Sequence, residues 1–160
     1  MQLLIISDLH LGRGKFFKNG LSNILEDFFE DQRFSELLEY YSLNDYFDKE
    51  IELVFNGDIF NLIQIDREGA FTHIIDEEHG LYALKQIELG HPKFFSAIKN
   101  FLSRPNKKLT YVIGNHDAAM AFTKVQETFR QTVGSNVEFC FYREVHGVHI
   151  EHGHRFEAIN

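Results

Sequence analysis

The chain has 160 residues, of which 44% are hydrophobic and 17 are Phe, which is enough for one domain with a sizeable core and too few for two. Its 16 basic and 24 acidic residues give a net charge of −8, which argues against a nucleic-acid backbone as the main partner. A single cysteine, Cys140, excludes an internal disulfide framework, and no apolar run is long enough for a signal peptide core or a membrane span. We therefore expect a soluble, cytoplasmic protein.

The first half of the chain predicts two strands with helices between them. Residues 3–7 form a short apolar run followed by a polar turn, which is typical of a buried strand. Residues 20–41 follow the helical period in two pieces, of which the second lies near 37–41. The first piece depends on five apolar residues: Leu21, Ile24, Leu25, Phe28 and Phe29. The acidic residues of the run 26–31 are expected to face solvent on that helix, and a second buried strand is expected at 51–55.

A long helical region follows over about residues 73–103. Gly90 and Pro92 interrupt it, because glycine weakens a helix and proline removes a backbone donor. The stretch "LTYVIGNHD" then repeats the pattern of a strand that ends in a turn.

The last part of the chain predicts a helix and a hairpin. Residues 118–133 are helical in pattern, and "VEFCFYREVHGVHIEHG" predicts a β-hairpin with its turn at His146 and Gly147. The order of elements, β-α-β-α-β-α-β-β, predicts an α/β domain.

Polar clusters follow four of the expected strands, which is where ligand sites gather in α/β sheets. The clusters contain Asp8 and His10; Asp58 and Asn61; Asn115, His116 and Asp117; and His152 and His154. Asp8 and His10 are two residues apart, so an extended backbone would place both side chains on one face. Asp58 follows a glycine, which allows a sharp turn that aims the carboxylate inward.

The chemistry of these side chains indicates a metal centre. Asp and Asn supply oxygen ligands, His supplies nitrogen, and no Cys takes part. This set favours a pair of divalent cations such as Mn, Fe or Zn over a structural zinc or a calcium cage. A carboxylate can bridge two such ions about 3.5–4 Å apart, a geometry used for displacement at phosphorus.

Each residue also has an ordinary structural explanation. Asp58 alone is a typical turn former or helix N-cap, and His152 alone is a typical hydrogen-bonded residue at the rim of a core. The same explanation is expected to hold for the remaining histidines: His73, His79, His91, His146 and His149. The coincidence of four clusters, each at a strand end, favours the metal centre.

The ordered strings "DLH", "GD" and "GNHD", with a later strand-end His, resemble the motifs of the calcineurin-like metallophosphoesterases. The resemblance covers nearly the whole chain. It implies a sandwich of two sheets with helices outside, and hydrolysis of phosphate esters or pyrophosphates at a two-metal centre. Within the family, "DLHLG", "GDIFN" and "HGH" are most similar to the branch that contains the UDP-2,3-diacylglucosamine hydrolases.

The resemblance also implies a role for each matching residue. Asp8 and His10 would bind one metal, Asp58 would bridge both, and Asn115 and His152 would bind the second. His116 would face the substrate and protonate the leaving oxygen or steady the phosphoryl charge, while a metal-held water attacks in line.

Two positions depart from the family pattern. Many relatives have Asp where this chain has Asn61, which can hydrogen-bond an imidazole but adds no charge to favour its protonation. The family's final GHxH motif is missing: the nearest string, "GHRF", has Phe156 where the second His belongs.

The missing motif leaves two interpretations of the last residues. We expect residues 1–160 to be the N-terminal part of a longer phosphoesterase domain, with an exposed sheet edge and one ligand lacking at each metal. Alternatively, His152 and His154 are the final motif of a shortened domain. In the first interpretation His154 is an outer partner of the site or a substitute ligand.

Three functions are compatible with the pattern. A hydrolytic phosphoesterase acting on a small phosphorylated substrate is favoured. A metal-binding scaffold with little catalysis is the alternative that Asn61 and the missing GHxH suggest. A nuclease is disfavoured by the net charge of −8.

Overall fold

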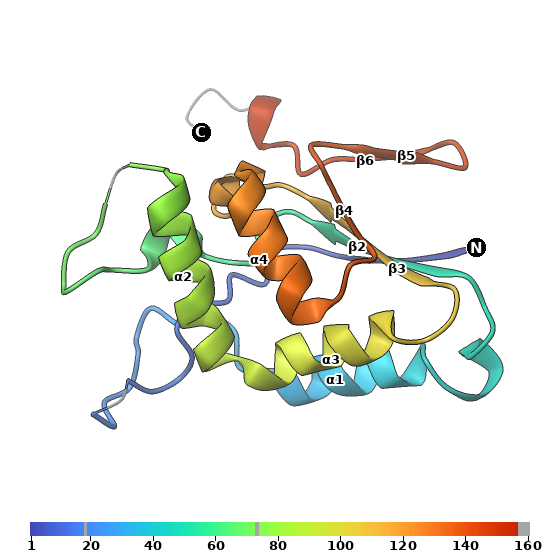
Figure 1. Ribbon diagram of the computed structural model, residues 1–160, viewed down its shortest axis with the longest axis horizontal. Helices are drawn as coiled ribbons and strands as arrows, with labels where there is room; N and C mark the ends of the chain where they lie inside the picture. The colour runs from blue at the N-terminus through green and yellow to red at the C-terminus, as the bar shows by residue number, and fades with distance from the viewer. Residues whose placement is uncertain (18, 73, 157–160) are drawn as a thin grey trace.

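A four-stranded parallel sheet with strand order β1-β2-β3-β4 forms the centre of the fold (Figure 1). The computed structural model describes residues 1–17, 19–72 and 74–156. The strands are β1 (Gln2–Ile6), β2 (Ile51–Asn56), β3 (Lys107–Val112) and β4 (Val137–Cys140). All residues of β2 except Asn56 are buried, as expected for a central strand covered on both faces.

Four helices pack on one face of this sheet: α1 (Asp31–Tyr40), α2 (Glu77–Gly90), α3 (Pro92–Leu102) and α4 (Thr123–Val133). Their apolar residues share one core with the helix-facing residues of the strands. Much of this core is aromatic: the ring of Phe94 on α3 stacks on Phe34 of α1 at 4.0 Å and on Phe55 of β2 at 6.0 Å. Short 3-10 helices lie at Asn44–Tyr46, Leu62–Gln64, Ala118–Ala121 and His154–Phe156.

A small antiparallel sheet covers the opposite face. It consists of β5 (Arg143–Val145) and β6 (Val148–Ile150), which run along the top of the main sheet in Figure 1. Ile150 packs against Val54 and Val112. The buried carboxylate of Glu52 in β2 also joins the two sheets, because it accepts a hydrogen bond from Arg143 Nε at 2.8 Å. The predicted α/β class with two sheets and external helices is confirmed.

The segment before α1 differs from the sequence prediction. The helix expected from residue 20 begins only at Asp31, and Leu21 and Ile24 are 65% and 90% exposed. The acidic run is not a solvated helix face, because Glu26 is buried and accepts hydrogen bonds from three backbone N–H groups. Asn23 accepts another from the N–H of Leu25. These bonds, of which those from Gly12 and Gly14 come from an earlier part of the chain, compete with the helical ladder and replace it.

The segment 137–140 also differs from the prediction. Instead of starting a hairpin, it pairs in parallel with β3, with Val137 opposite Leu109. The ring of Phe139 stacks on Tyr111 at 5.5 Å, so the helix-facing core holds this strand in the main sheet. The predicted hairpin turn at His146 and Gly147 is confirmed, with φ angles of 50° and 77°.

The two predicted helical regions are present with adjusted ends. The break expected near Gly90 and Pro92 separates α2 from α3, and the expected helix at 118–133 divides into a 3-10 turn and α4. None of the helices in the described part of the chain combines the length and apolar character that crossing a bilayer requires.

Candidate metal centre

The loops that follow β1 and β2 lie side by side beyond the sheet. The N–H of Asp8 donates to the carbonyl of Gly57 at 3.2 Å, and the N–H of His10 donates to the carbonyl of Asp58 at 3.0 Å. The extended backbone expected for Asp8 and His10 is wrong: both residues, like Asp58, are left-handed, with φ angles of 53°, 52° and 53°. Asp and His are among the residues that tolerate this conformation best.

The carboxylate of Asp58 lies at the centre of the cluster. Its Oδ2 is 3.2 Å from His152 Nε2 and 3.8 Å from His10 Nε2, and its Oδ1 accepts a hydrogen bond from the N–H of His116. Asp58 is 4% exposed. Within the described residues it belongs to two groups of potential ligand atoms, one with His10 and His116 and one with Asp8 and His152. One carboxylate is therefore shared between two sets of donors.

The imidazole of His152 lies between Asn56 and Asp58. Its Nδ1 lies 2.9 Å from the carbonyl oxygen of Asn56, which can only accept, so Nδ1 donates there, and its Nε2 lies 3.2 Å from Oδ2 of Asp58. Histidine ligands are commonly fixed by such a carbonyl contact. His152 is therefore fixed beside Asp58 by contacts of both ring nitrogens.

Two glycines allow the loops to approach this closely. A Cβ at Gly57 would lie 2.4 Å from the ring of His152, and a Cβ at Gly114 would lie 2.2 Å from Oδ1 of Asp58. Any side chain at either position would displace Asp58 or His152.

The turn after β3 is held by Asp117, to which the sequence analysis assigned no role. The buried carboxylate accepts hydrogen bonds from the N–H of Gly114 at 2.6 Å, the N–H of Ile59 at 3.0 Å and the hydroxyl of Tyr111 at 2.6 Å. Burial raises the pKa of Asp117 to about 6, although these donors lower it. Asp117 thereby ties the half-buried Asn115 and its neighbours to the loop after β2. The position of Asp117 at the end of the string "GNHD" was the only feature of the sequence that could have indicated this role.

His116 lies between the cluster and Asn61. Its ring meets that of His10 edge-on, with centroids 4.6 Å apart, and its Nδ1 lies 2.9 Å from Oδ1 of Asn61. The expected hydrogen bond between Asn61 and the imidazole is confirmed. Burial lowers the pKa of His116, as do His10 and His152, while Asp58 and Asp8 act in the opposite direction. The imidazole is therefore predominantly neutral at pH 7.

His154 lies beside the cluster. Its ring centroid is 5.4 Å from that of His152, its Nδ1 is buried without a hydrogen-bond partner among the described residues, and burial lowers its pKa. It belongs to neither group of ligand atoms formed by the described residues.

The remaining histidines are separate from the site. His91 is buried between two carboxylates and His79 contacts the carbonyl of Leu62, as expected for core or rim residues, whereas His146 and His149 are exposed. His73 lies outside the described residues.

Comparison with protein families gives one match to this chain. A model of the calcineurin-like phosphoesterase family matches residues 1–160. Neither the curated proteins nor the solved structures include a significant match.

Proposed function

Because the chain belongs to the calcineurin-like phosphoesterase family, we propose that it hydrolyses phosphate esters or pyrophosphates with the help of two divalent cations. The observation that carries the proposal is the position of Asp58 in two groups of ligand atoms. A buried carboxylate surrounded by imidazoles and a second carboxylate is the donor set that two borderline cations require.

We assign Asp8, His10, Asp58, Asn115 and His152 as the residues that would hold the cations, which we expect to be Mn, Fe or Zn. Bound there, two cations would supply a water of lowered pKa and charge neutralisation for the phosphoryl group. The contact of His152 Nε2 with the carboxylate of Asp58 supports this assignment.

His116 is the proposed catalytic residue. Because an amide oxygen only accepts, the contact with Asn61 keeps the Nδ1 proton in place and leaves Nε2 available to a substrate. A neutral imidazole can hydrogen-bond a phosphoryl oxygen. Protonation of a leaving oxygen requires a second proton on Nε2, which an approaching phosphate dianion would favour.

The substrate class follows from charge and family. A net charge of −8 favours small phosphorylated molecules over nucleic acid, so a nuclease is the weaker enzyme candidate. The resemblance to the UDP-2,3-diacylglucosamine hydrolases adds nucleoside pyrophosphates to the candidates.

A metal-binding scaffold is the second candidate function. The observation in its favour is that the partner of His116 is an amide, which provides no charge to raise the lowered pKa of the imidazole. Such a protein would hold cations without efficient turnover.

The test is a panel of phosphomonoesters, phosphodiesters and nucleoside pyrophosphates, offered to protein loaded with Mn, Fe or Zn. We expect metal-dependent turnover of at least one small substrate class. Bound metal without hydrolysis of any substrate would favour the scaffold, and DNA cleavage as fast as that of small diesters would favour the nuclease.

A further inference from the structure

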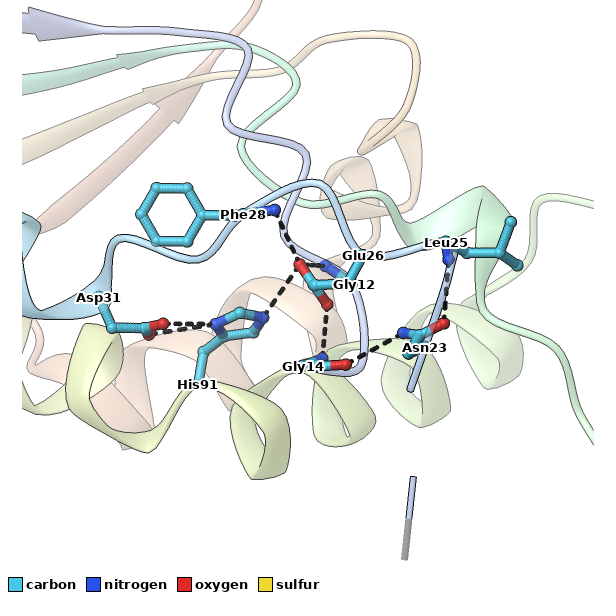
Figure 2. A network of polar contacts seen from close by, with 8 residues as sticks. All are labelled: Gly12, Gly14, Asn23, Leu25, Glu26, Phe28, Asp31 and His91. Atoms are coloured by element: carbon cyan, nitrogen blue, oxygen red, sulfur yellow. Dashed lines mark hydrogen bonds and ion pairs between the residues drawn. The ribbon is translucent and has the colours of Figure 1, made fainter. Parts of the chain in front are cut away.

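The segment between β1 and α1 is organised around one buried carboxylate. Glu26 is 4% exposed; its Oε1 accepts hydrogen bonds from the N–H groups of Gly12 at 3.0 Å and Phe28 at 3.2 Å, and its Oε2 accepts one from the N–H of Gly14 at 2.5 Å (Figure 2). One side chain therefore fixes both ends of a loop that has no regular secondary structure of its own.

A buried histidine supplies the opposite charge. His91, between α2 and α3, is 2% exposed; its Nε2 is 3.3 Å from Oε1 of Glu26 and its Nδ1 is 3.0 Å from Oδ2 of Asp31 (Figure 2). Burial lowers the pKa of His91, but the two carboxylates outweigh it and raise the value to about 9. Burial likewise raises the pKa of Glu26, yet His91 and the backbone donors lower it overall. Glu26 and His91 are thus both charged at neutral pH.

The loop passes directly over the end of α2. A Cβ at Gly90 would lie 2.2 Å from the carbonyl oxygen of Arg13, and a Cβ at Gly14 would lie 2.9 Å from the Cα of Gly90. The absence of side chains at Gly14 and Gly90 lets the two backbones touch. The charged pair of Glu26 and His91 then holds the loop in place against the helices.

A short path of hydrogen bonds joins the pair of Glu26 and His91 to the candidate metal centre. Gly12 follows Leu11, whose N–H donates to the carbonyl of Ile59 at 2.9 Å and whose carbonyl accepts from the N–H of Asn61 at 2.9 Å. The side chain of Asn61 contacts Nδ1 of His116. Glu26 therefore reaches the proposed catalytic imidazole through one stretch of backbone and one amide.

We infer that Glu26, paired with His91, is a positioning residue that sets the placement of Asn61 and through it the orientation of His116. The inference rests on the proposed function for the role of His116, but the placement itself is a property of the folded chain. Residues that orient reacting groups commonly contribute about 10–100-fold to activity without touching the substrate.

Glu26→Gln tests this inference. The amide keeps one acceptor oxygen but turns an NH₂ group toward the backbone N–H of Gly14 or of Gly12, so at least one loop contact is lost. Asp31→Asn is the matched control, because it weakens the partner of His91 on the side away from the loop and leaves the backbone contacts of Glu26 intact.

The first readout does not require activity. In zinc-loaded protein labelled with ¹⁵N-histidine, we expect Glu26→Gln to move the His116 Nδ1 resonance at fixed pH toward its position in Asn61→Ala. Asp31→Asn should leave that resonance in place. An unchanged resonance in Glu26→Gln, or the same change in both variants, would overturn the inference.

The second readout separates positioning from general destabilisation. With an aryl phosphodiester, Glu26→Gln should lower kcat about 10-fold with little change in KM, and should have no further effect in a His116→Ala background. An equal loss in that background would contradict the inference.

If the parent protein turns over no phosphoester, the proposed function fails while the resonance measurement still decides the placement. Should Glu26→Gln not fold, Glu26→Asp, which withdraws the carboxylate by one methylene, takes its place in both measurements.

Discussion

The imidazole of His152 packs against Gly57 so closely that a Cβ on this glycine would lie 2.4 Å from the His152 Cγ. Gly57 follows β2 and His152 follows β6, so the contact joins the two sheets at the candidate metal centre. The same glycine has a φ angle of 77°, which side-chain-bearing residues rarely adopt.

We expect Gly57→Ala to displace His152 and to weaken metal binding at the site that contains it. The left-handed backbone adds a cost of about 1–2 kcal/mol to folding. Gly147→Ala is the matched control, because Gly147 has the same φ angle of 77° but no heavy atom within 4 Å of the added Cβ. Metal content and turnover should fall only in Gly57→Ala; an equal fall in both variants would assign the effect to the backbone alone.

Asp58→Ala should be the most damaging single loss. It removes the carboxylate shared by both groups of ligand atoms and leaves two cations poorly screened from each other. We expect loss of at least one metal per chain and near-complete loss of hydrolysis, measured by elemental analysis and turnover. Asp45→Ala, which removes an exposed carboxylate, should change neither. Full occupancy of two metals in Asp58→Ala would contradict the assignment.

His116→Ala should leave the metal content close to that of the parent, because the residue is proposed to act on the substrate. Turnover should fall by about 10²–10⁴-fold, the range for losing a positioned acid. The loss should shrink for aryl esters with good leaving groups, which need little protonation. The same loss for every leaving group would show that His116 only positions the phosphoryl group.

Asn61→Asp should place a carboxylate beside Nδ1 of His116, which lies 2.9 Å from the present amide oxygen. A neighbouring negative charge favours the imidazolium and so raises its lowered pKa. The limb of the pH–rate profile that reports deprotonation of the catalytic acid should move to higher pH. An unchanged profile would mean that residue 61 does not influence the acid.

The buried pair of Glu26 and His91 should make stability depend on pH. Because the pKa of His91 rises from 6.5 to about 9 on folding, its stabilising contribution is complete below about pH 6.5 and is lost as the pH rises through about 9. The contribution is on the order of 3 kcal/mol. Denaturant unfolding of metal-free protein between pH 6 and pH 10 measures it. Asp31→Asn should make this loss smaller and complete it at a lower pH, since it removes one of the two carboxylates that raise the pKa of His91 in the folded state. Identical curves for both proteins would exclude His91 as the titrating group.

The sequence predicts those parts of the fold that depend on local pattern. The strands at 2–6 and 51–56 are short apolar runs, and the turn at His146 and Gly147 has residues that adopt positive φ. The polar clusters after the strands were predicted to converge, and Asp58 brings His10, His116 and His152 together. Parallel strands end at the same edge of a sheet, which accounts for the convergence of His10, Asp58 and His116. His152 follows β6 of the small antiparallel sheet, so its position depends on how the two sheets pack.

The failures of sequence analysis depend on contacts between distant segments. Residues 21–29 have helical spacing, but Glu26 meets His91, which is 65 residues away, and the resulting ion pair favours an irregular loop. Residues 137–140 join the main sheet because the ring of Phe139 stacks on that of Tyr111. No pattern in the neighbouring sequence indicates this partner. The tautomers of His116 and His152 likewise depend on Asn61 and on the carbonyl of Asn56.

The left-handed backbone at Asp8, His10 and Asp58 sets stability and activity against each other. Each of these residues holds a conformation that costs roughly 1 kcal/mol for a residue with a side chain and almost nothing for glycine. Glycine at the exposed Asp8 would therefore stabilise the metal-free fold while removing a proposed ligand, whereas glycine at the buried Asp58 would also lose the hydrogen bond from the N–H of His116. A directed-evolution experiment that selects only for heat resistance should accumulate glycine at residue 8, and one that also demands metal-dependent function should retain Asp8.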